Sequence, residues 1–475
     1  MPSPNALRAA IASALLASSL GACAVIPATP LTQTLKAPSA YASANRLAAP
    51  SADWPGDQWW TAYGERQLNG LMDEALAGSP DLAAAKARLA EAQAATAQAR
   101  AATLPSVTAN GSYASVKQSY NNGIPAAFVP KGYNDSGRVA LDFAWELDFF
   151  GKNRAALAAA TSDAEAAKAD AAEARLVLST NIATAYADLA QLFADRDASQ
   201  DAARIREQSA SLTAERVANG LENQGAAEQS KARLASARAD LAALDEQIGL
   251  TRNRLAALLG AGPDRGLAIA RPAVGAVKAF GLPANLSADL IGRRPDVVAA
   301  RLRAEAASQR IKQAKAQFYP AVNLSAYFGQ QALGLDLLNN ASSRIGSIGP
   351  AVSLPIFEGG ALRANYRGAA ADYDLAVASY NGTLAQALQD VADAAVSARA
   401  LDVRLSESRA ALQASTAAHG IAVQRYRGAL STYLDVLTAE DAMIANQRAV
   451  ADLETRAFTL DVALVRALGG GFRAA

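Results

Sequence analysis

The stretch VALDFAWELDF, residues 139–149, is the most informative part of the sequence, because its side chains alternate strictly in character. Apolar residues occupy every odd position, and alanine, aspartate or glutamate occupies every even one. A period of two is that of a β-strand. The pattern predicts a strand over 134–149 with one acidic and one apolar face. From spacing alone the apolar face suits a soluble core and lipid equally well, and it carries Leu141, Phe143, Trp145 and Leu147.

Three further segments alternate more weakly, over 106–118, 319–330 and 345–357. The last contains Pro350 and Pro355. A proline cannot donate to a strand ladder, so this strand is the least regular of the four.

The strands belong to two halves written on one plan. Pro80 and Pro105 lie 25 positions apart, as do Pro295 and Pro320, and an alanine-rich stretch fills each interval. Proline with aspartate beside it begins a helix, and the second proline ends it. We therefore expect two structural repeats over 73–265 and 266–468, followed by a tail over 469–475. Each repeat consists of a short helix, two strands, a long helix and a returning helix.

The long helices are exceptional. No glycine or proline occurs between Gly151 and Gly220, which predicts one helix about 100 Å long. The segment 358–427 repeats the pattern, although Gly368, Gly382 and Gly420 interrupt it, and shorter helices return over 225–260 and 431–468. Alanine on more than one face lets such helices pack closely on both flanks, as in a curved wall.

Composition excludes several classes of protein. The net charge of +1 argues against a nucleic-acid binder, and one histidine with one cysteine leaves neither a disulfide nor a His/Cys metal site. Gly260, Gly262 and Gly266 have the wrong spacing for a phosphate loop and fit a connection between the halves. We find no catalytic constellation, and expect no enzyme activity, metal or bound cofactor.

The N-terminus reads as an export signal over 1–22, with Arg8 before the apolar run from Ile11 to Leu20. The run is too short to span a membrane. Leu20-Gly21-Ala22-Cys23 resembles the bacterial lipobox, which implies that Cys23 carries a diacylglycerol and a fatty acyl chain such as palmitate. Ala24 replaces the aspartate that tends to retain such lipoproteins at the inner membrane. We expect a lipidated N-terminal segment over 23–72.

Together these features favour lipid over a soluble core, because no other segment offers a core for the strands to cover. Strands in a bilayer must close into a barrel, and small barrels need about eight strands. Four strands cannot close, so copies of the chain must combine, two giving eight strands and three giving twelve. The long helices then form the wall of a tube that extends into the periplasm.

Several motifs resemble those of the outer-membrane efflux factors, the TolC-like family, and most closely its lipidated OprM- and NodT-type members. They are Trp59-Trp60, LPSV (104–107), YPAV (319–322), RRPDVVAARLRAE (293–305), SLPIFEGG (353–360), RYRGALSTYLDVLTAE (425–440) and ALGGG (467–471). The resemblance implies a mainly α-helical homotrimer in the outer membrane. A shared 12-stranded β-barrel, four strands per chain, continues into a long α-helical periplasmic barrel.

The resemblance also implies partners and a passive function. Such ducts work with a periplasmic adaptor protein and an inner-membrane pump, here of the RND type, and conduct small toxic compounds or drugs out of the cell. No nucleic acid is involved. Two alternatives remain: the duct of a type I protein secretion system, and a lipid-anchored trimeric coiled coil with a structural role.

Family members close the periplasmic tip of the tunnel with acidic residues after the RYxxG motif. Asp435 matches one such position, whereas Thr438 stands where a second aspartate is usual. Asp441, with Glu440 beside it, is a further source of charge. If apolar packing closes the tip instead, Leu434 and Leu437 have the spacing for it.

Overall fold

The computed structural model describes residues 26–41, 47, 50–273, 281–283 and 286–474. The expected export signal and the expected lipidation site at Cys23 lie outside the described residues. None of the helices in the described part of the chain combines the length and apolar composition needed to cross a membrane.

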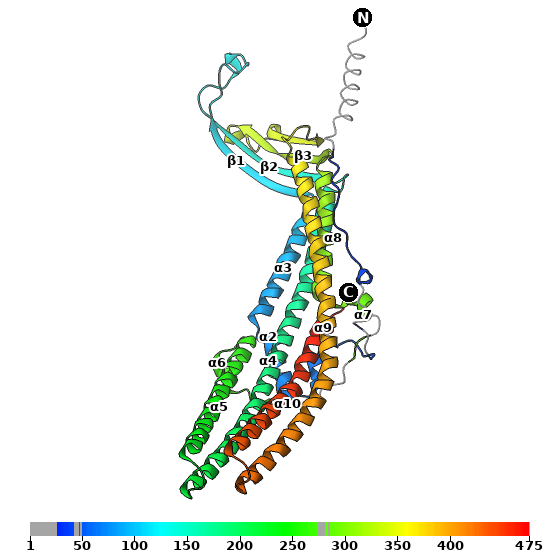
Figure 1. The fold of residues 1–475 in the computed structure, drawn as a ribbon. Helices are drawn as coiled ribbons and strands as arrows, with labels where there is room; N and C mark the ends of the chain where they lie inside the picture. The colour runs from blue at the N-terminus through cyan, green and yellow to red at the C-terminus, as the bar shows by residue number, and fades with distance from the viewer. Residues whose placement is uncertain (1–25, 42–46, 48–49, 274–280, 284–285, 475) are drawn as a thin grey trace. The chain divides into compact units, whose positions relative to one another are not determined.

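The same order of elements occurs twice along the chain (Figure 1). Each half contains a helix of 22 residues, two strands, a helix of 67 residues and a returning helix of 35 residues. In the first half these are α3 (Pro80–Ala101), β1 (Ser106–Val116), β2 (Asn134–Leu147), α4 (Lys152–Ala218) and α5 (Gln224–Leu258). In the second half they are α8 (Pro295–Ala316), β3 (Ala321–Leu333), β4 (Arg344–Ser353), α9 (Ala361–Arg427) and α10 (Tyr433–Ala467).

Short elements lie before, between and within the two repeats. They are η1 (Pro38–Ala40), η2 (Trp59–Tyr63), α2 (Arg66–Gly78), η3 (Ala126–Phe128), α6 (Pro263–Leu267), α7 (Leu286–Arg293), η4 (Leu335–Leu337) and η5 (Ala341–Ser343).

Local chemistry explains where the helices begin. Pro80 and Pro295 start α3 and α8, each with an aspartate in the first turn that complements the positive end of the helix dipole. Asn223 caps α5, since its side-chain oxygen accepts the Ala226 N–H at 3.0 Å. The glycines expected to interrupt the second long helix lie within α9, which is continuous.

The chain forms two compact units, and each takes segments from both halves. Unit 1 comprises the described residues up to Leu35 with Leu89–Ala166 and Ala300–Tyr380. Unit 2 comprises Lys36–Arg88, Ala167–Ala299 and Asn381–Ala475. The sequence repeats therefore interleave in space instead of folding as separate domains.

Unit 1 contains a four-stranded antiparallel sheet in the order β1-β2-β3-β4. The pairing of β2 with β3 joins the two halves of the chain. Within the described chain β1 and β4 each have a strand neighbour on one side only. Pro350 lies in the edge strand β4, which ends at Ser353. The segment that includes Pro355 was predicted as strand and instead follows the strand end.

The sheet register sorts side chains by polarity in rows that cross all four strands. Val107 pairs with Phe143, which pairs with Ala326, which pairs with Ile348. One residue along, Thr108, Asp142, Tyr327 and Ser347 form the next row. Since successive side chains point to opposite faces, the sheet has one apolar and one polar face over its whole width.

Unit 2 has a hydrophobic core around η2 and α2. Trp60, Leu68 and Met72 pack with Ile182, Tyr186 and Leu189 of α4 and with Phe458 and Val462 of α10. The Tyr63 and Phe458 rings meet edge to face with centroids 4.4 Å apart. The segment of η2 and α2, which precedes the first repeat, thus completes the core between the long helix of one half and the returning helix of the other.

The terminal glycine motif is required by close packing. Gly469 and Gly471 have φ angles of +85° and +90°, which side-chain-bearing residues rarely adopt. A Cβ atom on Gly469 would lie 2.0 Å from the Arg293 carbonyl oxygen, and one on Gly471 would lie 2.4 Å from the Gly56 carbonyl carbon. Only glycine fits at either position.

Candidate functional site

The apolar face of the sheet is open to its surroundings. Ile348 is 77% exposed, and Phe328, Val107 and Leu141 are exposed as well. Phe143 and Leu147 are half-buried by their neighbours on the same face. Contact with water is unfavourable for a face of large apolar side chains that extends across four strands. Its chemistry is that of a lipid-facing surface.

The polar face holds its charges in pairs. Asp142 accepts a hydrogen bond from Asn110 Nδ2 at 2.8 Å and lies 3.5 Å from Arg138 Nη2. Glu146 forms an ion pair with Lys152 at 2.6 Å. The acidic residues of VALDFAWELDF therefore line a hydrated surface where each has a partner, as the inner wall of a channel requires.

Trp145 marks the end of the sheet nearest the helices. Its indole Nε1–H donates to the carbonyl oxygen of Thr103 at 3.2 Å, just after α3. An aromatic ring with one polar edge suits the boundary between lipid and water. Leu141 lies four residues before Trp145 in β2, further from the end of the sheet. A charge introduced at Leu141 therefore tests the lipid-facing assignment more severely than one at Trp145.

The two helical hairpins of unit 2 turn with the same backbone geometry. Gly220 and Ala429 both have positive φ angles, +70° and +59°. The next residues, Leu221 and Leu430, donate backbone N–H groups to Arg216 and Arg425 at 2.8 Å. This is the αL helix ending with a six-to-one hydrogen bond, which glycine favours and alanine adopts only with strain.

A tyrosine connects the two turns. The Tyr426 hydroxyl donates to Glu222 Oε2 at 3.0 Å, and the Arg216 guanidinium lies over the Tyr426 ring at 4.5 Å. Burial and the Glu222 carboxylate raise the pKa of Tyr426, so the phenol remains a donor at neutral pH. Sequence analysis missed this contact. Arg216 and Arg425 hold matching positions before the two turns, but nothing in the sequence indicates the partner of Tyr426.

Leu434, Asp435 and Thr438, all expected at the gate, lie together on the first turns of α10. All three are exposed, Leu434 by 64%. Asp435 Oδ2 accepts the Thr432 N–H and hydroxyl, each at 2.9 Å, in a capping box. Hydrogen bonds from the Thr432 backbone and side chain lower the pKa of Asp435, so this carboxyl is ionised at neutral pH. Leu437 is buried against Tyr426 and Tyr433 within the chain.

Asp441 lies apart from these three. It pairs with Arg233 of α5 at 2.6 Å and with Arg206 of α4 at 3.4 Å. Glu440 beside it is fully buried, accepts the Ser209 hydroxyl at 2.8 Å and lies 3.6 Å from Arg206 Nε. Both carboxylates thus connect α10 to the first hairpin inside one chain. Removing one partner would leave a buried charge uncompensated.

A membrane-type β-sheet joined to hairpins of 67-residue helices defines a class of protein, the outer-membrane ducts that extend into the periplasm. Comparison with known proteins shows which family within this class the chain belongs to. The chain matches the model of the family described as outer membrane efflux protein over residues 71–261 and 286–470, and it belongs to that family. It is an outer-membrane efflux channel, as its motifs predicted.

Individual relatives agree with this assignment. The multidrug resistance outer membrane protein MdtP of Shigella flexneri is 30% identical over 432 residues, which cover 90% of this chain and 88% of MdtP. The fusaric acid resistance protein FusA of Burkholderia cepacia is 36% identical over 329 residues, 68% of this chain and 61% of FusA. The crystal structure of VceC from Vibrio cholerae superimposes with a TM-score of 0.84 at 46% identity, covering 88% of this chain and 100% of VceC.

The sheet faces can be tested with two lysine substitutions. We expect Leu141→Lys to lower the amount of protein in the outer membrane, because a lysine on the lipid face costs about 2–4 kcal/mol near the bilayer midplane. Ser325→Lys, on the polar face, should assemble at the wild-type level. Quantitative blotting of outer-membrane fractions measures both. Equal yields for the two variants would contradict the assignment of faces.

The contact between the hairpin turns predicts a second result. Tyr426→Phe removes the hydrogen bond to Glu222, worth about 1 kcal/mol, and should raise the single-channel conductance in planar bilayers. Glu222→Gln should act in the same direction. Tyr41→Phe, which loses a bond to the Asn381 carbonyl oxygen, is the control and should conduct like wild type. Unchanged conductance in both Tyr426→Phe and Glu222→Gln would show that the hydrogen bond between the hairpin turns does not hold the channel closed.

Proposed function

We propose that three copies of this chain form the exit duct of a tripartite efflux system. A periplasmic adaptor connects the duct to an inner-membrane pump of the RND type, and small toxic compounds leave the cell through it. The observation that carries this proposal is the sheet in unit 1, with its apolar face and its two open edges. The names of MdtP and FusA refer to resistance to multiple drugs and to fusaric acid, which supports a small-molecule substrate.

The number of copies follows from barrel closure together with the family resemblance. Four strands enclose no lumen, and an open edge in hydrocarbon leaves backbone groups unsatisfied. Two copies would give an eight-stranded barrel, whose interior is just wide enough for its own side chains. Three copies give twelve strands and room for a passage, which favours the trimer.

Deletion of the gene and bilayer recording test the function together. Cells that lack the protein should become more susceptible to small toxic compounds, and the purified protein should conduct ions in planar bilayers. Loss of a secreted protein from the medium, without altered susceptibility, would instead indicate a type I secretion duct. A purified protein that never conducts would indicate a structural coiled coil.

We also propose that Cys23 is acylated and anchors the chain to the outer membrane. Support comes from the segment that follows it. The backbone N–H groups of Thr32 and Gln33 and the Thr32 hydroxyl all donate to the carboxylate of Asp374 in α9. An extended chain from Cys23 to Thr32 reaches about 30 Å. Asp374 lies about 20 Å along α9 from its start after the sheet, so the tether is long enough for lipid at the membrane surface.

Labelling with a radioactive fatty acid tests the anchor. Wild-type protein should be labelled and Cys23→Ser should not. Because strands and not lipid span the membrane, Cys23→Ser should still reach the outer membrane. Equal labelling of both proteins would contradict acylation at Cys23.

The gate is the third proposal: in the trimer, three Asp435 carboxylates ring the periplasmic constriction. Asp435→Asn retains an oxygen that accepts the Thr432 N–H but removes about three negative charges, and should weaken channel block by divalent cations. Thr438→Asp adds a second ring of carboxylates and should strengthen the block by divalent cations. Titration of a divalent cation from the periplasmic side in bilayer recordings measures both. Unchanged block in both variants would mean that these residues do not face the lumen.

A further inference from the structure

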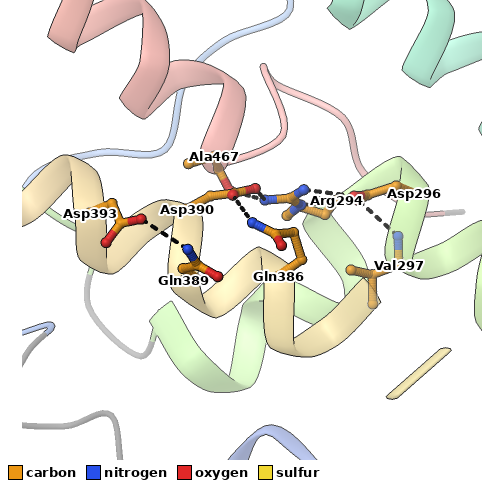
Figure 2. A network of polar contacts seen from close by, with 8 residues as sticks. All are labelled: Arg294, Asp296, Val297, Gln386, Gln389, Asp390, Asp393 and Ala467. Atoms are coloured by element: carbon orange, nitrogen blue, oxygen red, sulfur yellow. Dashed lines mark hydrogen bonds and ion pairs between the residues drawn. The ribbon is translucent and has the colours of Figure 1, made fainter. Parts of the chain in front are cut away.

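One buried arginine in unit 2 joins three helices (Figure 2). Arg294, 8% exposed, lies directly before α8 and binds Asp296 at 2.6 Å and Asp390 of α9 at 2.8 Å. Its Nη1 also donates to the carbonyl oxygen of Ala467, the last residue of α10, at 3.4 Å. Asp390 accepts a further bond from Gln386 Nε2 at 2.8 Å. We call these residues the Arg294 junction. The Arg294 guanidinium already forms ion pairs with two carboxylates, those of Asp296 and Asp390.

A cavity of about 640 Å³ adjoins the Arg294 junction, and a third carboxylate faces it from α4. This is Glu173. The charged groups around Glu173 come from every helix packed there. They are Arg294 and Asp296 at the start of α8, Asp390 and Asp393 of α9, Arg466 of α10, and Asp170 of α4 itself. Negative groups outnumber positive ones, so an ionised Glu173 adds repulsion that Arg294 and Arg466 only partly offset.

Burial raises the pKa of Glu173 to about 7, with the Asp296 carboxylate as the next largest cause and Arg294 and Arg466 opposing it. The pKa of glutamate in an unfolded chain is near its ordinary value of 4.5. Folding therefore favours the protonated form. Relative to the opened chain, the packing of α4 is therefore strongest below about pH 4.5, weakens as the pH rises from there to about 7, and changes no further above it.

We propose that Glu173 makes the contact between α4 and the Arg294 junction a proton-sensitive one. When Glu173 is protonated, α4 packs against α8, α9 and α10 without an additional charge in the cavity. When Glu173 is ionised, the contact loosens and water enters to solvate the carboxylate. This property goes beyond the proposed efflux function and does not depend on it, since the contact lies within one chain.

Hydrogen–deuterium exchange of the full chain in detergent tests the proposal. Protection factors for peptides around residue 173 and around residue 466, corrected for intrinsic rates, should fall about tenfold or more between about pH 5.5 and about pH 8 in wild type. Glu173→Gln should keep the high protection at both pH values. Glu207→Gln, an exposed carboxylate on the same helix paired with Arg238, is the matched control and should behave like wild type.

A second variant moves the transition instead of abolishing it. Arg466→Gln removes a cation that favours ionised Glu173, so the midpoint of the protection loss should move to higher pH. The proposal is overturned if Glu173→Gln retains the wild-type pH dependence, or if wild type shows none. An unmoved midpoint in Arg466→Gln would equally overturn it, and this outcome leaves the efflux function untouched.

Discussion

The unpaired outer edges of β1 and β4 are the constraint on which the rest of the structure depends. Each edge presents backbone N–H and C=O groups, and no strand of the described chain pairs with them. In hydrocarbon every such group costs several kcal/mol if it remains unsatisfied. The apolar face suits hydrocarbon, which is why we propose that these edges pair with the edges of other copies of the chain. A closed barrel with a lumen follows from that pairing.

In the helical part, charged side chains contribute to holding the two hairpins together. The long helices are rich in alanine, and beyond the core around η2 and α2 the two hairpins share small apolar clusters, such as Ala202 with Met443 and Ile444. Ion pairs and hydrogen bonds between helices supplement this apolar packing. Asp441 joins α10 to Arg206 and Arg233, and Arg294 joins α8, α9 and α10. Such contacts respond to pH and to neighbouring charge more readily than an apolar core does.

Much of this could be predicted from sequence because the decisive signals are local. Period-two alternation defined β2, and the absence of glycine and proline defined α4 to within two residues at each end. The fourth strand was predicted to extend beyond Ser353 because apolar alternation continues at Leu354 and Ile356, on either side of Pro355. The glycines within α9 had no structural effect, since its packing overrides their weak helix propensity.

The contacts between hairpins could not be predicted in this way. Tyr426 and Glu222 lie 204 positions apart, and periodicity within a helix does not specify which residue of another hairpin it meets. The same holds for Glu440. It reads as one more solvated carboxylate in a charged helix, whereas the structure buries it beside Arg206. Local patterns specify the elements, and the pairing of distant side chains depends on how the two halves interleave.

The most direct test of the closed barrel is the mass of the assembled protein. Native mass spectrometry of protein extracted from outer membranes in mild detergent should give one species of three mature chains, each retaining its acyl groups. A species of one or two chains, stable under the same conditions and still conducting ions, would contradict the account.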